Sequence, residues 1–172
     1  LTGTVEADET YLGGVRHGMK QGYRGNKTPV VALVERGGRV RSMVMGNVTG
    51  RNLRQVLREH VDSGAILMTD ENPAYLAPGR SFAAHHTVNH SAKEYARGIV
   101  NTNTIEGYFS ILKRGIDGIY HHVDKSYIPQ YLGEFDFRYN HRNITDGQRT
   151  VVGLRKASGK RLMLRRRPMV SP

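Results

Sequence analysis

The chain has 172 residues, 38% of them hydrophobic, which allows one domain with a proper core. It has no cysteine, which excludes disulfides and thiolate metal sites, and no apolar run near the roughly 18 residues that a membrane helix needs. Its formal net charge of +11 indicates a polyanionic partner, nucleic acid rather than a membrane, although a basic surface can also be inert.

The first part of the chain predicts strands. Residues 2–14 alternate apolar and acidic side chains, which is the period of a strand, and a Gly-Gly pair ends it. Residues 15–27 are rich in glycine and basic side chains, which indicates a loop. The β-branched residues 28–35 and residues 39–48 flank a second Gly-Gly pair, so together they predict a hairpin.

A helix and a buried strand follow. Thr49 can cap a helix over about residues 51–62. Residues 65–69 form a short apolar run that ends at Asp70, which is typical of a central parallel strand buried on both sides. The apolar stripe of the helix comprises Leu53, Val56, Leu57 and Val61.

The second half predicts mainly helices. After a short helix or turn at residues 71–79 and a strand at 81–88, an Asn-Thr-Asn-Thr run favours the start of a helix that reaches residue 115. Residues 115–124 indicate a loop, and the apolar side chains between residues 127 and 135 recur at helical spacing.

This order of elements predicts a ribonuclease-H-like α/β domain over residues 1–145. Its mixed sheet would contain three antiparallel strands followed by parallel ones, with helices on its faces. Residues 146–172 are assigned to a basic C-terminal tail, which we expect to be mobile from Lys156 onward.

Three acidic residues converge in such a fold. Asp8 lies on the first strand, Asp70 ends the buried strand, and Glu106 lies one turn into a helix that packs on the sheet. The pattern alone leaves alternatives open: Glu6 shares the strand face of Asp8, Glu9 is its neighbour, and an Asp at the end of a strand can cap the next turn.

These acids suit phosphodiester chemistry. Two Asp and one Glu can hold Mg²⁺, a hard cation that prefers oxygen ligands, and a pair of such ions can stabilise the attacking and leaving oxygens together. Glu106, Ser110 and Lys113 share one helix face, so Lys113 could hold a phosphate beside the acids. The alternative is a solvated Glu and Lys on an exposed stripe.

The histidines do not predict a zinc site. His85, His86 and His90 lie close together in the sequence, but their spacing matches no helical pair and no cysteine assists them. A contact with DNA phosphate, or a plain surface position, fits them better.

Five segments of the chain together resemble a known family. They are VEADETYLGG, MTDENPAY, NHSAKEYA, NTNTIEGYFSILKRGIDGIYHHV and YLGEFDFRYNHR, between Val5 and Arg142. They resemble the DDE-type transposases of bacterial insertion sequences, in the ISXO-like branch, whose catalytic core has the retroviral-integrase-like fold.

The resemblance implies a function and a site. Asp8, Asp70 and Glu106 would be the catalytic and metal-binding acids, with two Mg²⁺ or Mn²⁺ ions. The enzyme would nick double-stranded DNA at the ends of the element and join the freed 3′-hydroxyl to target DNA, as a homo-oligomer on DNA in the nucleoid region of the cytoplasm. We assign DNA contacts to Lys113, Arg114, Asn103, His90, Arg24 and Lys27.

Two rival functions remain at this point: a ribonuclease-H-like nuclease that cleaves without joining, and an inactive DNA-binding protein derived from a transposase. The chain also departs from the family in two ways. It contains no zinc ribbon, and Phe109 stands where many members carry Trp. Recognition of the element's ends is therefore either missing or located upstream of Leu1, and the chain is either a catalytic-domain fragment or a decayed copy.

Overall fold

The computed structural model describes residues 1–13, 27–89, 96–97, 99–121 and 123–160. The chain divides into two compact units, Leu1–Asn140 and His141–Pro172. The loop predicted at residues 15–27 lies outside the described residues except for Lys27.

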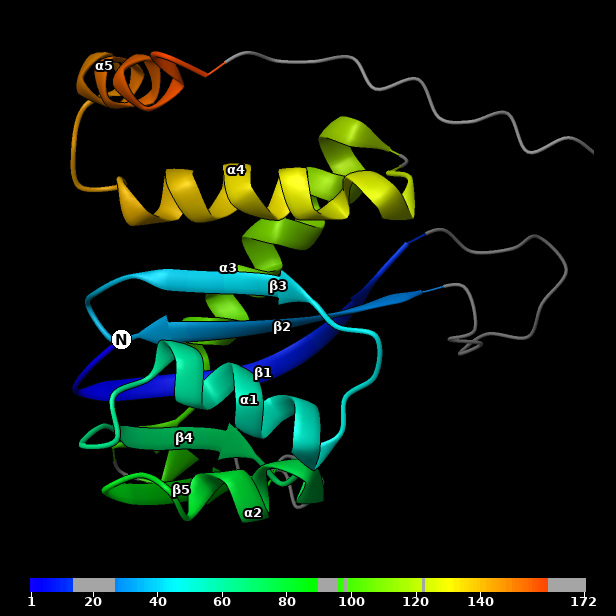
Figure 1. The fold of residues 1–172 in the computed structure, drawn as a ribbon, viewed down its shortest axis with the longest axis vertical. Helices are drawn as coiled ribbons and strands as arrows, with labels where there is room; N and C mark the ends of the chain where they lie inside the picture. Colours follow the sequence, from blue (N-terminus) through cyan, green and yellow to red (C-terminus); the bar gives the residue numbers. More distant parts are fainter. Residues whose placement is uncertain (14–26, 90–95, 98, 122, 161–172) are drawn as a thin grey trace, which may run out of the picture. The chain divides into compact units, whose positions relative to one another are not determined.

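The first unit is built on a five-stranded mixed sheet with the strand order β3-β2-β1-β4-β5 (Figure 1). β1 pairs antiparallel with β2, which pairs antiparallel with β3, whereas β1, β4 and β5 run parallel. This is the predicted ribonuclease-H-like arrangement. The strands span Thr4–Leu12 (β1), Thr28–Glu35 (β2), Val40–Val44 (β3), Ile66–Asp70 (β4) and Ala84–Val88 (β5).

The hairpin of β2 and β3 forms where the sequence predicts it. β2 consists largely of β-branched residues, and Val30 to Val34 are all fully buried, as expected of a strand covered on both faces. The turn that follows contains Gly37 at a φ of 71°, a backbone conformation that glycine adopts without strain. β2 therefore brings Arg36, the residue after it, to the end of the sheet where β1 begins.

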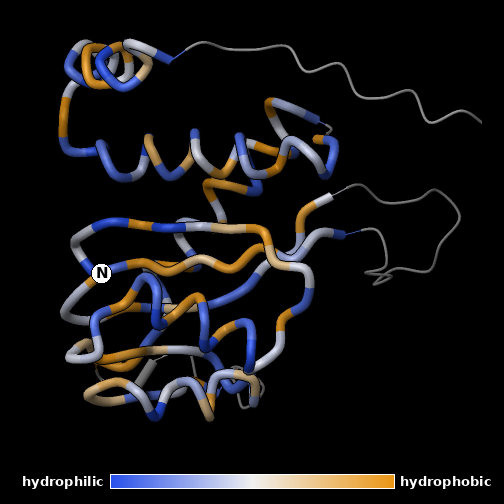
Figure 2. The backbone as a smooth tube through the Cα atoms, in the orientation of Figure 1, coloured by the Kyte–Doolittle hydropathy of each residue, from blue (hydrophilic) through white to orange (hydrophobic). Residues whose placement is uncertain are grey.

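Helices cover the two faces of the sheet. α1 (Gly50–His60) begins at the predicted cap, where the Thr49 side chain accepts a hydrogen bond from the backbone of Asn52, and its apolar stripe packs on one face. α3 (Asn103–Gly115) and α4 (Ile128–Asn140) enclose the core on the other face. In Figure 2, β2 is largely hydrophobic, whereas hydrophobic and hydrophilic residues alternate along α1 and α4, as expected of helices with one buried side.

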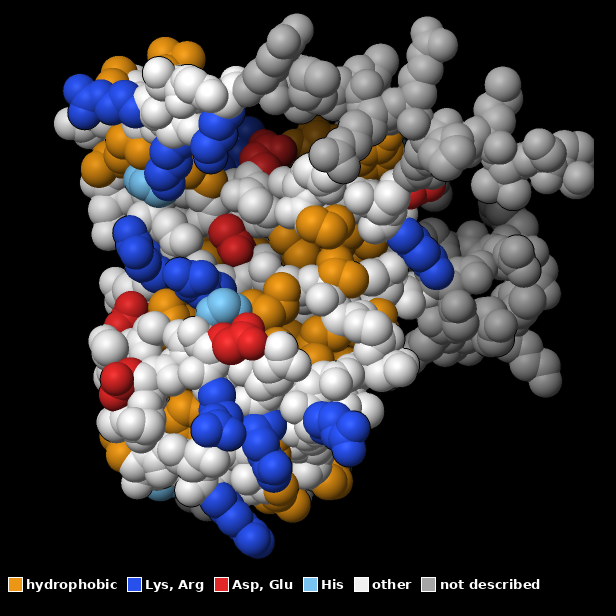
Figure 3. Space-filling view, viewed as in Figure 1, with side chains coloured by type: hydrophobic (Ala, Val, Ile, Leu, Met, Phe, Trp, Pro, Cys, Tyr) orange, Lys and Arg blue, Asp and Glu red, His pale blue; other side chains and the backbone are white. Residues whose placement is uncertain are grey.

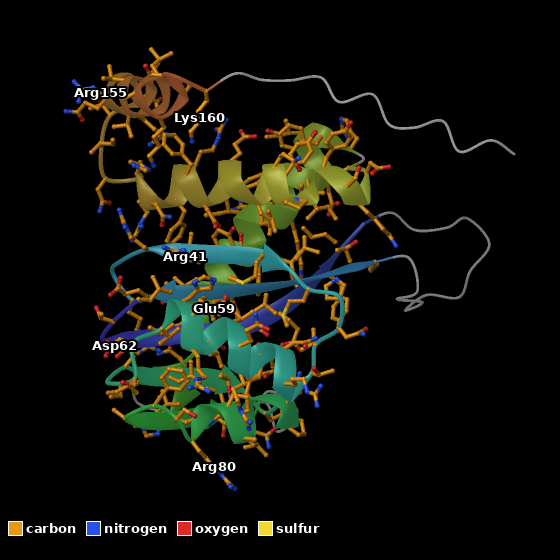
Figure 4. The ribbon with its side chains drawn as sticks, viewed as in Figure 1. Arg41, Glu59, Asp62, Arg80, Arg155 and Lys160 are labelled. Atoms are coloured by element: carbon orange, nitrogen blue, oxygen red, sulfur yellow. The ribbon has the colours of Figure 1, made fainter. Side chains whose placement is uncertain are left out.

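We call these two sides of the sheet the α1 face and the α3 face. Exposed basic side chains gather over α1 and α2 (Leu76–Gly79) on the α1 face (Figure 3), and Arg80 points away from the sheet (Figure 4). The exposed basic residues of this surface are Arg51, Arg54, Arg58 and Arg80.

Short elements complete the unit. A 3₁₀ turn (Pro73–Tyr75) and α2 (Leu76–Gly79) follow β4, as the sequence indicates for this stretch. β6 (Ala96–Arg97) and β7 (Val100–Asn101) form a two-stranded antiparallel pair that the sequence did not predict. A second 3₁₀ turn (Lys125–Tyr127) leads into α4.

The loop predicted after α3 is wrong in its first half. Residues Ile116–Tyr120 form a π-helical turn that continues α3, because the buried Ile116 extends the apolar stripe and its amide bonds to the carbonyls of Leu112 and Lys113. Gly115 suggested a break. Instead it provides space: a Cβ there would lie 2.2 Å from the ring of Phe135 on α4.

The second unit contains α5 (Asp146–Ala157), within the segment assigned from sequence to a tail. A capping box starts it, in which Thr145 and Gln148 exchange side-chain and backbone hydrogen bonds. Lys156, where we expected mobility to begin, lies in the last turn of this helix. Residues 161–172 lie outside the described residues. No helix in the described ranges has the length and apolar character needed to cross a membrane.

Candidate active site

Asp8 and Asp70 lie level with one another on neighbouring parallel strands. The ladder of β1 and β4 pairs Thr4 with Ile66 and Glu6 with Met68. Continued by two more residues, the same register sets Asp8 beside Asp70. Side chains that are level in a parallel pair point to the same face of the sheet, so the two carboxylates share a face.

That face is the α3 face. Glu6 lies two residues before Asp8 on β1, and its carboxylate accepts a hydrogen bond of 2.9 Å from the backbone amide of Ile105 on α3. Because side chains of a strand alternate between faces, Asp8 also points toward α3.

Glu106 approaches from α3. It lies in the first turn of the helix, where a negative charge interacts favourably with the helix dipole. The hydroxyl of Thr102, a fully buried residue at the helix N-cap, donates a hydrogen bond of 2.9 Å to its carboxylate. Glu106 therefore has a defined side-chain orientation.

The pKa of Asp8 is shifted by burial and by the neighbouring acids. Burial raises the pKa of Asp8 to about 7, and the negative charges of Asp70, Glu9 and Glu106 add to the increase, while the backbone amide of Glu9 opposes it. Asp70 and Glu106 thus lie near enough to Asp8 to act on its proton. Without a cation, Asp8 is about half protonated at neutral pH.

A pocket of about 380 Å³ opens beside the two aspartates. Lys113 lines it from α3, as expected from its place on the Glu106 face of the helix, and Lys27 lines it from the start of β2. The full lining comprises Asp8, Glu9, Thr10, Tyr11, Lys27, Asp70 and Lys113. Acids and lysines together suit a phosphate ester and the cations that accompany it.

Of the other residues predicted to contact DNA, two are exposed on α3 and two lie outside the described residues. Asn103 is exposed at the first residue of α3, and Arg114 is exposed near its end, where its guanidinium donates to the carbonyl of Ser110. His90 and Arg24 lie outside the described residues.

The described residues contain no group of three His, Cys, Asp or Glu side chains arranged to hold a metal ion as they stand. His85, from the candidate zinc cluster, shares a hydrogen bond of 3.0 Å with the Thr69 hydroxyl. The carboxylates of Asp8, Asp70 and Glu106 nevertheless provide the hard oxygen donors that Mg²⁺ and Mn²⁺ take.

The acids beside Asp8, which the sequence left as alternatives, have other partners. Glu6 is fully buried and forms an ion pair of 2.6 Å with Arg36. Glu9 points to the opposite face, where it accepts hydrogen bonds from the side chains of Asn72 and Tyr75. The partners of Glu6 and Glu9 are distant in the sequence, so no local pattern could show which acid of β1 is paired.

Comparisons with known proteins show the family and the fold of the chain. Residues 1–140 match the model of a family described as ISXO2-like transposase domain. An uncharacterized transposase-like protein of Haemophilus influenzae is 27% identical over 106 residues, which cover 62% of this chain and 85% of the relative. Among solved structures, the catalytic core domain of BIV integrase aligns with a TM-score of 0.57, covering 90% of this chain and 95% of that one. At 14% sequence identity, this last likeness shows the fold alone.

Proposed function

The chain belongs to the ISXO2-like transposase family, and we propose that it is a transposase catalytic domain that cuts DNA strands and joins them to target DNA with the help of divalent cations. In this proposal, Asp8, Asp70 and Glu106 are the catalytic and metal-binding acids.

One observation carries the proposal. Asp8 and Asp70 are level on adjacent parallel strands, and the charge of Glu106, from a helix on the same face, contributes to the raised pKa of Asp8. A largely buried acid whose pKa is raised by neighbouring acids is costly to ionise unless a proton or a cation offsets its charge. Such groups are therefore good candidates for a functional site.

The residues present fit Mg²⁺ or Mn²⁺, and we propose that two ions bind. Three carboxylates leave coordination positions open for water and phosphate oxygens. When bound, the ions would stabilise the negative charge on the attacking and leaving oxygens of the phosphodiester. Cation binding would also release the proton that Asp8 holds near neutral pH.

The chain's own side chains would position the DNA. Lys113 and Lys27 line the pocket that contains the two aspartates, so we assign them contacts with the phosphates that flank the scissile bond. Asn103 and Arg114 would extend this contact along α3, and Arg24 and His90 would add to it. We propose that water attacks in the cleavage step and the freed 3′-hydroxyl attacks in the joining step.

We also propose the setting in which the domain works. Its partner is double-stranded DNA, both element ends and target, bound by a homo-oligomer in the nucleoid region of the cytoplasm. The net charge of +11 supports a polyanionic partner.

The test is a strand-transfer assay. Labelled DNA carrying the ends of the element that encodes the chain is incubated with the protein, Mn²⁺ and an unlabelled plasmid. We expect nicked ends and labelled plasmid. Nicking without labelled plasmid would make the protein a nuclease, and DNA binding without nicking would make it an inactive DNA-binding protein.

A further inference from the structure

We propose that the two acids flanking Asp8 are positioning residues, each of which holds the segment that carries another member of the acidic site. Glu6, with Arg36, fixes the start of α3 and hence Glu106. Glu9, with Asn72, fixes the segment that follows Asp70. This inference rests on the proposed function, because it concerns the same three acids.

The first clamp is centred on Glu6. One carboxylate oxygen accepts from the Arg36 Nε at 2.6 Å, and the other accepts from the amide of Ile105, the residue before Glu106, at 2.9 Å. The two terminal nitrogens of Arg36 donate to the carbonyls of Ile99 and Asn101, both at 2.7 Å.

The Glu6 clamp therefore bonds to the chain on both sides of Thr102. Asn101 precedes it and Ile105 follows it, while the Thr102 hydroxyl itself orients the Glu106 carboxylate. Holding these two neighbours fixes the backbone from which Thr102 and Glu106 project.

The second clamp is centred on Glu9. Its two oxygens accept from the Asn72 side-chain amide at 2.7 Å and from the Tyr75 hydroxyl at 3.0 Å. The backbone amide of Asn72 in turn donates to the Asp70 carboxylate at 3.0 Å. Glu9 thus anchors on β1 the residue that orients Asp70 on β4.

Other contacts also hold the segments that the clamps tie. α3 is already held by its apolar stripe and by Tyr108, whose hydroxyl donates to Asp136 on α4 at 2.7 Å. The ion pair joins the fully buried Glu6 to a partly exposed Arg36, and burying a charge in such a pair is commonly no more stabilising than apolar side chains of the same volume. The clamps fix the position of the backbone next to Glu106 and next to Asp70. Hydrogen bonds that orient metal-binding groups typically strengthen metal binding, and losing them lowers the metal affinity.

Two conservative variants loosen the clamps. Arg36→Lys keeps a positive charge beside Glu6 but cannot reproduce the fork that reaches Ile99 and Asn101. Asn72→Ser keeps an oxygen that can cap the following 3₁₀ turn, but its side chain is too short to reach Glu9.

Matched controls exist in the same chain. Arg149→Lys alters an arginine that likewise donates to one acid, Asp146, and to two backbone carbonyls, but lies in the second unit. Asn140→Ser removes an amide that donates to and accepts from the backbone of Val40, away from the acids.

Two measurements are made on each protein. The first is the rise in melting temperature caused by Mn²⁺ alone, without DNA, over a range of concentrations. The second is the Mn²⁺ concentration for half-maximal cleavage of element-end DNA. For Arg36→Lys and Asn72→Ser we expect both midpoints to rise by about 10-fold or more. DNA affinity in EDTA should be unchanged, and both controls should keep the wild-type Mn²⁺ midpoints.

Other outcomes overturn the inference. If both clamp variants keep the wild-type Mn²⁺ midpoints, whatever their loss of melting temperature, the clamps are only structural. If Arg36→Lys does not fold, Asn72→Ser decides. If the wild type neither cleaves DNA nor responds to Mn²⁺, both the proposed function and this inference are wrong. If the wild type responds to Mn²⁺ and both clamp variants have the same midpoints as the wild type, only this inference is wrong.

Discussion

The α3-facing side of β1 contains two acidic regions with opposite electrostatic surroundings. In the first, Glu6 is fully buried but receives a guanidinium and a backbone amide from the protein itself. In the second, at the next position along the same face, Asp8 accepts a hydrogen bond from the backbone amide of Glu9 and faces the negative charges of Asp70 and Glu106.

The difference separates an acid that holds the fold from one available for chemistry. A buried carboxylate with its own counter-charge is satisfied and has little to gain from another ligand. A half-buried carboxylate among like charges, beside an open pocket, gains from any cation that enters. Two residues of the same charge on the same face are therefore expected to respond differently to substitution.

The largest effect is expected at the second region. Asp70→Asn, Asp8→Asn and Glu106→Gln should each lower Mn²⁺-dependent cleavage by at least about 100-fold, because the stabilisation that a bound ion gives to the transition state amounts to several kcal/mol. DNA affinity should stay similar or rise slightly, since a negative charge is removed. Cleavage that persists in all three variants would move the chemistry elsewhere.

The first region should respond in stability. Arg36→Met leaves the buried Glu6 without its counter-charge, which should cost about 3 kcal/mol of unfolding free energy in urea denaturation. Adding Glu6→Gln should recover much of that loss, because the double variant no longer buries a charge. If the double variant is as unstable as Arg36→Met, the counter-charge is not what Arg36 supplies.

The pH dependence of the metal-free protein provides a third test. Because the pKa of Asp8 is raised from 3.8 to about 7, the folded state binds more protons than the unfolded state between these values. Asp8 therefore lowers the free energy of unfolding as pH rises through this window.

Asp8→Asn removes this effect. In EDTA, it should be more stable than wild type by about 4 kcal/mol at pH 8, with the advantage disappearing toward pH 4. Urea denaturation at several pH values measures it. An Asp8→Asn variant that is no more stable than wild type at pH 8 would show that the acids do not strain the metal-free fold.

The smallest stability effect is expected at Lys113. It is exposed, so Lys113→Ala should change the free energy of unfolding by no more than about 0.5 kcal/mol. DNA binding or strand transfer should fall by a larger factor, and Lys113→Arg should restore much of it, since charge matters more than shape here. A large loss of melting temperature with normal DNA processing would make Lys113 structural.

Much of the fold could be predicted from the sequence, because local signals agree with the tertiary structure. The buried strand that ends at Asp70, the Thr49 cap and the stripe of α3 each follow from pattern. The π-helical continuation after Gly115 did not follow, because that glycine serves a contact with Phe135 rather than a break. The residues of α5 were assigned to a tail, although Thr145 and Gln148 form a capping box at the start of this helix.

The candidate site was predicted less completely. Periodicity puts Asp8 on a strand and Glu106 on a helix face, but it cannot separate Asp8 from Glu6, which has the same charge and faces the same side. Their difference depends on Arg36 and Ile105, which reach β1 only through the folded chain. The roles of the three acids as metal ligands stay predictions.

The shared register of β1 and β4 has a consequence for motion. Asp8 and Asp70 lie two residues beyond the paired stretch of β1 and β4, and we expect central strands such as these to be among the last parts of the domain to open. Glu106 is held by the N-terminus of a helix, a region that can open locally at much lower cost. The bonds from Glu6 to Ile105 and from Thr102 to Glu106 are therefore the contacts that keep the third acid in place beside the other two.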